Sequence, residues 1–302
     1  EESALTCLAW LRQLGQGERA IRRFWDPLIY AVCNAGSAEI GADMGAWVVR
    51  EGLCARADAL DLGIATVPQA ELFAPAVSSC LGARGGEVRT GADVAALAGT
   101  GSRITGVRLG TGEEIPADAV VLAVPWEAAH ALLPERFRAG APWKALAPGA
   151  ILSVTLVLDR TVLPVGEDFV ALVDTPVQWA FSKTRLWGLD QERETLSLVV
   201  SGANALAGRS REDLVTLATR SLETCLPGMA RARILDAVVM KEKRATFLPA
   251  PGSARLRPGP KVDGLEGLAL AGAWTATGWP ATMEGAVLSG QAAAEALLTA
   301  GV

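Results

Sequence analysis

The apolar positions of the first 85 residues recur at helical spacing. Four leucines near the start fall every three residues, which places them on one face of a helix: Leu5, Leu8, Leu11 and Leu14. Pro27 predicts the first turn of a further helix, because proline suits that position. We expect Ser37 to cap another helix and residues 69–82 to form one more, so this segment is mostly helical. Residues 64–67 are expected to form a short strand that Pro68 ends.

Residues 87–124 change to a strand pattern. The apolar positions at 94–97 and the alternation over 104–109 predict two strands, with Gly110-Thr111-Gly112 as a turn after them. The run over 119–124 is apolar throughout and ends before Pro125. A strand buried on both faces has this composition, as in a parallel sheet covered by helices. The segment therefore predicts the inner half of a dinucleotide-type domain.

The rest of the chain is rich in strands and holds two clear helices. Strand patterns cover 151–158, 169–173, 178–181, 196–200 and 233–247. Ser210 is expected to cap a helix that runs to about residue 226, with two acidic residues in its first turn. A buried strand over 268–271 and a helix from about Thr282 to residue 298 follow a loop rich in proline and glycine.

Composition narrows the classes of function. The 302 residues are enough for two interlocked domains, and half of them are apolar, as in a well-packed protein. The net charge of −5 comes without basic clusters, so no nucleic-acid partner is expected. The five cysteines match no metal or redox spacing, and His130 is the only histidine, so no metal is expected. A Ser-His-Asp triad would have to use His130, which the pattern places on a surface helix.

The same features suggest a reduced, cytoplasmic protein. The opening Glu-Glu-Ser is neither basic nor apolar, so no signal peptide is expected. The longest uncharged run, residues 267–283, is interrupted by glycines and Pro280, whereas a spanning helix needs about 20 apolar residues. This pattern is compatible with peripheral contact between the protein and the inner membrane.

The segment 270–290, LAGAWTATGWPATMEGAVLSG, holds the candidate chemistry. It predicts a strand, a loop with Gly272 and Gly278, and a helix that begins near Thr282. The first N–H groups of a helix lack intrahelical partners and favour an anion or an oxygen-rich group. An ordinary helix packed on a sheet is the alternative interpretation.

This segment resembles the C-terminal flavin motif of the FAD-dependent amine oxidase and carotenoid desaturase superfamily. Within that superfamily, Gly-Trp-Pro-Ala-Thr-Met-Glu-Gly-Ala at 278–286 is most similar to the hydroxysqualene dehydroxylases, and residues 18–28 and 241–247 resemble the same group. The resemblance covers nearly the whole chain and implies FAD as cofactor. It implies that Val94 meets the adenine end and that six further residues bind FAD: Gly272, Ala273, Trp274, Thr282, Met283 and Glu284.

Two features depart from the family pattern. The GxGxxG fingerprint, whose backbone lies against a pyrophosphate, is not found, because the Gly-Thr-Gly turns at 99–101 and 110–112 lack a third glycine. Ala273 stands where the family often has an acidic residue that accepts a hydrogen bond from ribityl or ribose hydroxyls. We therefore expect an N-terminally truncated flavoprotein whose sheet lacks its first βαβ unit, and which is inactive alone.

The resemblance implies the reductive dehydroxylation of hydroxysqualene to squalene, on a long isoprenoid substrate. Trp179, Phe247 and Trp279 could line an apolar tunnel, with core packing as the alternative role for each ring. A carotenoid or phytoene desaturase is the alternative enzyme. A non-catalytic fragment that pairs with a separate fingerprint-bearing polypeptide is the alternative of another class. No catalytic acid can be selected among the Asp and Glu residues.

The fold class that follows is α/β with α+β. An incomplete FAD-binding domain with a parallel sheet is interleaved with a substrate domain of mixed β-sheet and helices. Residues 1–85 are assigned to the helical part of the substrate domain and 86–148 to the FAD domain. Residues 149–250 form the mixed sheet and helix of the substrate domain, and 251–302 form the C-terminal FAD-domain segment.

Overall fold

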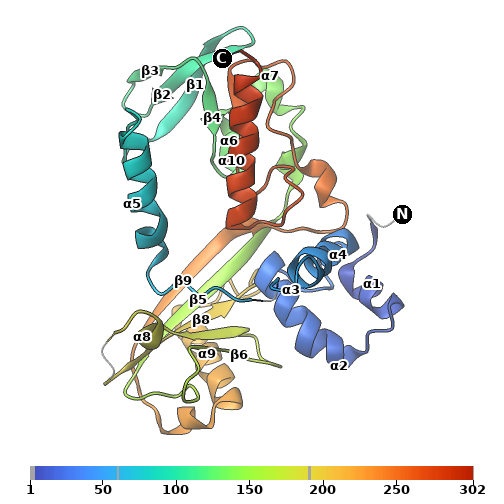
Figure 1. The fold of residues 1–302 in the computed structure, drawn as a ribbon, viewed down its shortest axis with the longest axis vertical. Helices are drawn as coiled ribbons and strands as arrows, with labels where there is room; N and C mark the ends of the chain where they lie inside the picture. The colour runs from blue at the N-terminus through green and yellow to red at the C-terminus, as the bar shows by residue number, and fades with distance from the viewer. Residues whose placement is uncertain (1–3, 60, 190–191, 302) are drawn as a thin grey trace.

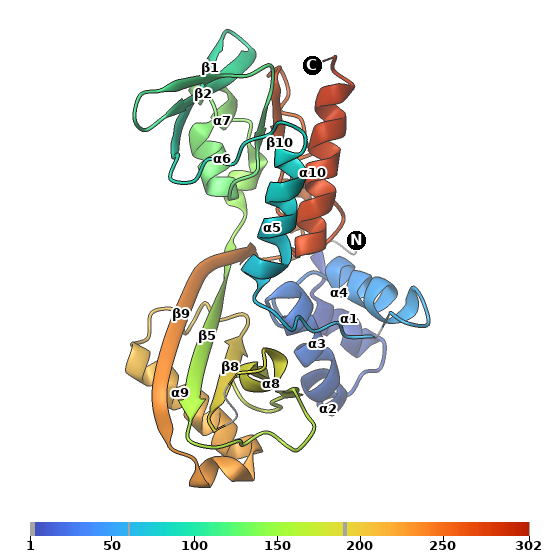
Figure 2. The same ribbon diagram turned by 60° about the vertical axis from the view of Figure 1, so that its left-hand side comes forward.

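A computed structural model describes residues 4–59, 61–189 and 192–301. Its elements form an N-terminal group of helices, a five-stranded sheet with a covering helix, and a unit of two small sheets with helices (Figure 1). Two long strands, β5 (Pro148–Leu158) and β9 (Ile234–Phe247), run from the large sheet to the two-sheet unit (Figure 2). The chain is therefore a mixed α/β protein, as the sequence predicts, while its division into four segments stays a prediction.

The N-terminal group packs around small and aliphatic side chains such as Leu11 and Ile29. Its helices are α1 (Cys7–Gln13), α2 (Glu18–Ala20), η2 (Ile21–Trp25), α3 (Asp26–Cys33), α4 (Ala42–Val49) and η3 (Arg50–Cys54). The expected cap at Ser37 is wrong, because α4 begins only at Ala42. The Ser37 carbonyl instead accepts from the Leu8 N–H at 2.8 Å, so this turn satisfies the start of α1.

The strand expected at 64–67 is also wrong, because these residues form no ladder with any described strand. They lead into α5 (Gln69–Gly82), which the sequence predicts correctly. Nothing in the described part of the chain buries a residue of α5. Its larger apolar side chains are exposed, including Phe73 at 47% and Val77 at 54%. An amphipathic helix with an uncovered apolar side is a surface that another element can cover.

The two small sheets differ in direction. Antiparallel pairs join β1 (Val94–Thr100), β2 (Arg103–Leu109) and β3 (Glu114–Pro116), whereas β4 (Val120–Leu122) and β10 (Leu268–Leu270) pair in parallel. Burial of β4 on both faces is wrong, since Val121 is 43% exposed. Within the described residues β10 is the only strand beside β4, so a full parallel sheet does not form there. The helices of this unit are α6 (Trp126–Leu132), α7 (Glu135–Arg138), η4 (Pro142–Ala145), η6 (Ser253–Leu256) and α10 (Met283–Leu298).

The large sheet is antiparallel, with the order β6-β7-β8-β5-β9. The remaining elements are β6 (Phe169–Ala171), β7 (Trp179–Ser182), α8 (Lys183–Leu186), β8 (Glu194–Val200), α9 (Arg211–Cys225) and η5 (Pro227–Arg231). Ser210 caps α9 as predicted, since its hydroxyl accepts from the Asp213 N–H at 3.0 Å. The side chains of α9 pack on one face of the sheet, where Leu152, Leu196 and Leu198 are fully buried.

Because side chains alternate along a strand, the other face of this sheet carries the intervening positions. Ser153, Ser197 and Val199 lie there and are only partly buried. The five-stranded sheet therefore has one face covered by α9 and one face that borders open space. Among the described helices, none has both the length and the apolar composition that crossing a bilayer requires.

Candidate functional site

The turn after β10 requires glycine. Gly272 has φ +134°, and its N–H donates to the Ser289 hydroxyl of α10 at 2.7 Å. A Cβ at this position would lie 2.4 Å from Nε1 of Trp274, which is closer than side-chain atoms approach. The chain thus passes tightly between β10 and α10 at the point where the motif begins.

Trp274 faces the protein core. It is 5% exposed, its Nε1 donates to the Val124 carbonyl at 3.0 Å, and its ring lies 5.8 Å from that of Trp143. The indole N–H and the indole ring therefore both have their partners inside the protein. Ala273 beside it is half-buried and carries only a methyl group, so the polar groups of this stretch are those of its backbone.

Arg257 fixes the loop that follows Gly272, and it is not among the site residues predicted from the sequence. Its guanidinium donates to the carbonyl of Ala273 at 3.1 Å and to that of Thr275, and it lies 4.7 Å from the centre of the Phe247 ring. Burial lowers the pKa of Arg257 to about 10, which leaves it cationic at neutral pH. A lone arginine in a Pro/Gly-rich loop gives no periodic signal, so only the folded chain shows its role.

Helix α10 begins at Met283, next to the predicted start near Thr282, and Thr282 caps its first turn. The Thr282 hydroxyl accepts from the Gly285 N–H at 3.2 Å, which leaves the N–H groups of Met283 and Glu284 without intrahelical partners. Met283 is 58% exposed and Glu284 is exposed as well. The motif therefore brings six of the seven predicted cofactor residues onto one loop and one helix start.

Val94, the seventh predicted residue, lies elsewhere. It begins β1, opposite Leu109, in the three-stranded sheet. That sheet meets the motif segment through the Ile104 N–H, which donates to the Glu266 carbonyl at 2.9 Å just before β10. Val94 and Gly272 are thus in sheets that touch but do not share strands.

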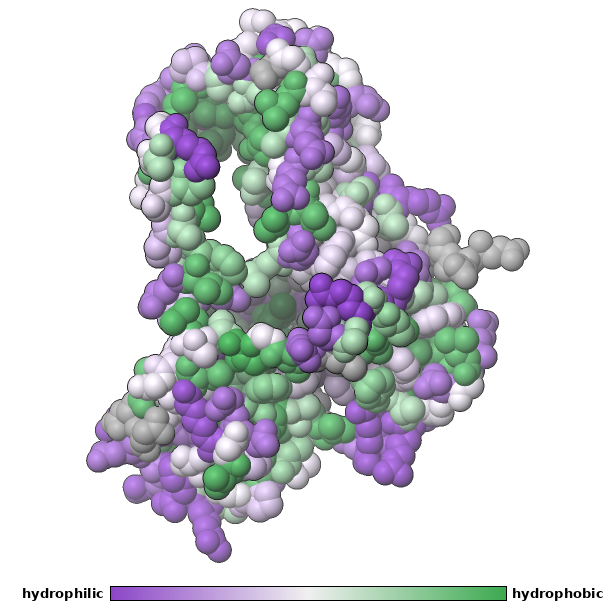
Figure 3. Space-filling model, viewed as in Figure 1, coloured by the Kyte–Doolittle hydropathy of each residue, from purple (hydrophilic) through white to green (hydrophobic). Residues whose placement is uncertain are grey.

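A cavity of about 1030 Å³ lies against the open face of the large sheet. Its wall combines this face with the linker before α5, the start of α5, α8 and the tip of α10 at Met283. The residues that reach it from the sheet and α8 include Ser153, Phe181, Lys183, Trp187, Ser197, Val199 and Met240. In Figure 3, hydrophobic side chains gather around the hollow where α5 and α10 approach the sheet. An apolar cavity thus borders the free N-terminus of the motif helix.

Lys183 is the only charged residue among the described residues that line this cavity. Its ammonium lies 4.3 Å from the centre of the Trp187 ring and 5.9 Å from that of Phe181. Burial lowers the pKa of Lys183 from its ordinary value. In the part of the chain that the structure covers, Nζ of Lys183 has no hydrogen-bond or ion-pair partner.

The three aromatic rings that were considered for an apolar tunnel pack elsewhere in the structure. Phe247 is buried in the core beneath Arg257, and Trp279 meets the edge of the Trp47 ring at 4.8 Å. Trp179 packs with Phe169 and Phe181, which also contact each other, in a cluster of three rings. None of the three is among the residues that line the cavity.

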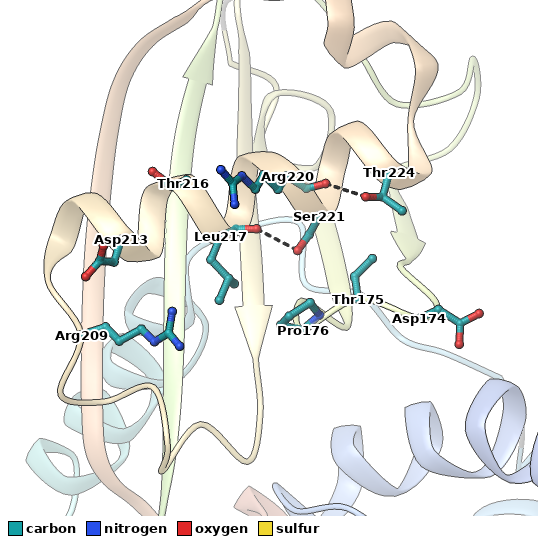
Figure 4. Close-up of a pocket in the computed structure, with 10 residues that line it drawn as sticks. All are labelled: Asp174, Thr175, Pro176, Arg209, Asp213, Thr216, Leu217, Arg220, Ser221 and Thr224. Carbon is teal, nitrogen blue, oxygen red and sulfur yellow. Dashed lines mark hydrogen bonds between the residues drawn. The ribbon is translucent and has the colours of Figure 1, made fainter.

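A second hollow, of about 510 Å³, follows the outer side of α9 (Figure 4). The Ser221 and Thr224 hydroxyls in it donate back to carbonyls of their own helix, at 2.9 and 2.8 Å. None of the motif residues lines it. Its lining combines side chains of α9 with Arg209 and residues 174–176, and both of these hydroxyls are used within the helix.

The remaining candidate chemistry is dispersed. All five cysteines are free, and burial raises the pKa of the Cys7 and Cys33 thiols to about 12, so they are poor nucleophiles. His130 contacts the Arg138 carbonyl at 3.3 Å on α6. Among the described residues, no three His, Cys, Asp or Glu side chains are grouped to hold a metal ion.

Comparison with known proteins decides the family. The family model described as flavin containing amine oxidoreductase matches residues 3–298. The chain belongs to this family. The FAD cofactor and the oxidoreductase class expected from the sequence agree with membership in it.

Several similar proteins have names that refer to isoprenoid substrates. The chain is 34% identical over 282 residues to a hydroxysqualene dehydroxylase of Sinorhizobium fredii, which covers 92% of the chain and 62% of that protein. A hydroxysqualene dehydroxylase of Rhodopseudomonas palustris is 34% identical over 280 residues, with 91% and 62% covered. A 15-cis-phytoene desaturase of Synechococcus elongatus is 28% identical over 65% of the chain and 43% of its own length. The chain thus spans about 62% of the first two relatives.

Solved structures show the same fold at low sequence identity. A redesigned putrescine oxidase has a TM-score of 0.71 at 16% identity, over 99% of this chain and 68% of its own. An oxidoreductase from Methanosarcina mazei has a TM-score of 0.68 at 17% identity, over 96% and 68%. The arrangement of sheets and helices described above is therefore that of the flavin amine oxidase fold.

Proposed function

We propose that this chain is the larger part of a hydroxysqualene dehydroxylase, which removes the hydroxyl of hydroxysqualene to give squalene with FAD as cofactor. The observation that carries the proposal is the position of Met283, which lies both in the motif and on the wall of the large apolar cavity. A cofactor at the tip of α10 and a long isoprenoid in the cavity would then meet at this residue.

The residues of the motif fit a flavin nucleotide. Gly272 allows the tight turn between β10 and α10 that positions the motif, and the loop after it is held by Arg257. The free N–H groups of Met283 and Glu284 suit an oxygen-rich chain, and the exposed Glu284 carboxylate can accept from a hydroxyl. Thr282 shapes this end as the cap, while Trp274 and Ala273 contribute backbone groups. Val94 is proposed for the adenine end.

When bound in its reduced form, FAD supplies the hydride for such a reaction. The protein orients the substrate and excludes water, and the apolar cavity wall does both for a long hydrocarbon. A substrate of this kind dissolves in lipid rather than in water. We therefore propose that the protein contacts the inner membrane peripherally to obtain it.

We propose further that a GxGxxG-bearing βαβ unit outside these 302 residues completes the nucleotide domain. The exposed Val121 of β4, the exposed apolar side of α5 and Val287 of α10 are the surfaces it would cover. Parallel strands normally have helices on both faces, and a pair of such strands alone is not stable. The greater length of the hydroxysqualene dehydroxylase relatives supports this proposal.

A phytoene desaturase is the second candidate, supported by the similarity to the Synechococcus enzyme. The two reactions run in opposite redox directions, since a desaturase substrate reduces the flavin. A non-catalytic fragment is the third candidate, and its support is the same exposed surface of α5 and β4.

Product analysis tests the proposal. This chain is co-expressed with a GxGxxG-bearing segment of a hydroxysqualene dehydroxylase relative, and the complex is given either hydroxysqualene with reduced flavin or phytoene with oxidised flavin. We expect flavin absorbance to co-purify with the complex but not with the chain alone, and mass spectrometry to show squalene. Unchanged hydroxysqualene together with desaturated phytoene would support the second candidate. A chain that purifies alone as a yellow, stable monomer would contradict the need for a further segment.

A further inference from the structure

Lys183 is a cation in an apolar cavity. The side chains around it are aliphatic, aromatic, thioether, hydroxyl and amide groups, and no carboxylate among the described residues lines the cavity. The only described groups that attract the Lys183 ammonium are the π faces of two aromatic rings, those of Trp187 and Phe181. Cation–π contacts offset only part of the cost of removing an ammonium from water. The three N–H donors of Nζ remain free for a ligand.

A pure hydrocarbon has no atom that can accept a hydrogen bond from the Lys183 ammonium. Filling the cavity with a hydrocarbon would desolvate the ammonium further without any new hydrogen bond, which costs binding energy. A ligand with one oxygen at the right position would instead accept from Nζ, and the rest of its length would lie on the apolar wall. The cavity therefore discriminates between ligands by the presence of one polar atom.

We propose that Lys183 is the specificity-determining residue of this site, and that its ammonium donates a hydrogen bond to the hydroxyl oxygen of an isoprenoid alcohol in the cavity. The inference rests on the proposed function and deepens it. It explains how one cavity can select hydroxysqualene over squalene, and so release its product. No bond is formed or broken in this step.

Placement on α8 supports this role. The Ser182 hydroxyl accepts from the Arg185 N–H at 3.3 Å, so the residue directly before Lys183 caps the N-terminus of the short helix. The Thr184 hydroxyl accepts from the Thr195 N–H of β8 at 2.8 Å, which fixes the helix to the sheet. The ammonium is thus carried by a helix that directly follows β7 and is hydrogen-bonded to β8 through Thr184.

The test compares two ligands that differ by one hydroxyl, hydroxysqualene and squalene. Binding to the complex of this chain with the GxGxxG-bearing segment, in mild detergent, is followed by tryptophan fluorescence, to which Trp187 beside Lys183 contributes. We expect the wild-type chain to bind hydroxysqualene at least about tenfold more tightly, as one hydrogen bond to a charged donor implies. Lys183→Met should remove this preference and leave squalene binding unchanged or tighter.

Three further variants separate the explanations. Lys183→Arg keeps the charge and the donors, so it should retain part of the preference. Lys183→Gln keeps a neutral donor and serves if the methionine variant does not fold by circular dichroism. Lys144→Met removes an exposed lysine that lies outside the cavity lining, and should bind both ligands as the wild type does.

Two outcomes would overturn the inference in different ways. Equal binding of both ligands by the wild type, unchanged in Lys183→Met, would exclude the role of Lys183 while leaving the cavity as an isoprenoid site. Binding of neither ligand would remove the cavity from the proposed function, and the inference with it.

Discussion

The side-chain oxygen of Asn34 accepts a hydrogen bond of 2.8 Å from the backbone N–H of Gly202. Asn34 ends α3 with φ +53°, and its amide nitrogen donates to the Thr246 hydroxyl of β9 at 2.9 Å. It is buried, so neither bond competes with bulk water. One side chain therefore ties the N-terminal helices both to the end of β8 and to β9.

Replacing Asn34 with alanine should lower the free energy of unfolding by about 2–4 kcal/mol. Both bonds are lost, the Gly202 N–H is left without its acceptor, and alanine tolerates a positive φ less well than asparagine. Guanidinium denaturation measures the change. Thr246→Val removes only one of the two bonds and should cost about 1 kcal/mol. Equal losses in the two variants would show that the bond to Gly202 contributes little.

The motif glycines offer a matched pair. Gly272 and Gly278 both have positive φ, at +134° and +78°, but only at Gly272 would a Cβ meet another atom within 4 Å. Gly272→Ala should therefore displace Trp274 and cost about 2–4 kcal/mol, against about 1 kcal/mol for Gly278→Ala. The near-ultraviolet circular dichroism of the tryptophans should change in the first variant only. Similar melting curves for both variants would contradict the tight passage between β10 and α10.

Arg257 is expected to act on the loop rather than on the fold at large. Arg257→Met leaves the carbonyls of Ala273 and Thr275 without their donor, which should cost about 2–4 kcal/mol. Hydrogen exchange should rise most strongly over residues 273–277. Arg255→Met, a change at an exposed neighbour, is the control and should leave exchange unaltered. Uniformly raised exchange throughout the chain would instead point to a general loss of packing.

Acid sensitivity should centre on Asp159 near the start of β9. A hydrogen bond from the Arg160 side chain, followed by the backbone and side chain of Arg233, lowers the pKa of Asp159 below its ordinary value of 3.8. A carboxylate with a lowered folded pKa stabilises the protein above its unfolded pKa, and this contribution is lost as the pH falls through the folded value.

Asp159→Asn should therefore melt at a lower temperature than the wild type between about pH 5 and 7, and the difference should shrink below about pH 4. Differential scanning calorimetry at several pH values measures this. Asp118→Asn is the control, because Asp118 forms no ion pair in the described part of the chain. A difference that stays constant down to the lowest pH would rule out the titration of Asp159 as its source.

Local patterns in the sequence predicted local structure well. The cap at Ser210, the start of a helix near Thr282, the helix over 69–82 and the strands of the large sheet depend on neighbours a few residues away, and the structure confirms them. The errors concern partners far along the chain. Val121 was expected to be buried, but its strand β4 has only one described neighbour. Ser37 was expected to cap the helix after it, but its carbonyl accepts from the N–H of Leu8 in the earlier helix α1.

The site shows the same division between local and distant signals. The order of residues in the motif locates the loop and the start of α10, because those residues are contiguous. Arg257 and Lys183 have no such signal, since their roles come from the carbonyls and rings that the fold places around them. No pattern in the single sequence marks the open face of the large sheet as a cavity wall.

The paired strands β5 and β9 enter two hydrophobic cores. At one end Phe247 lies opposite Pro148 and packs in the core of Trp274, and at the other Leu158 packs with the side chains beneath α9. Fraying of this ribbon at either end would weaken the ladder that the opposite core depends on. Heat should therefore melt the five-stranded sheet and the two-sheet unit together, in one cooperative endotherm rather than two.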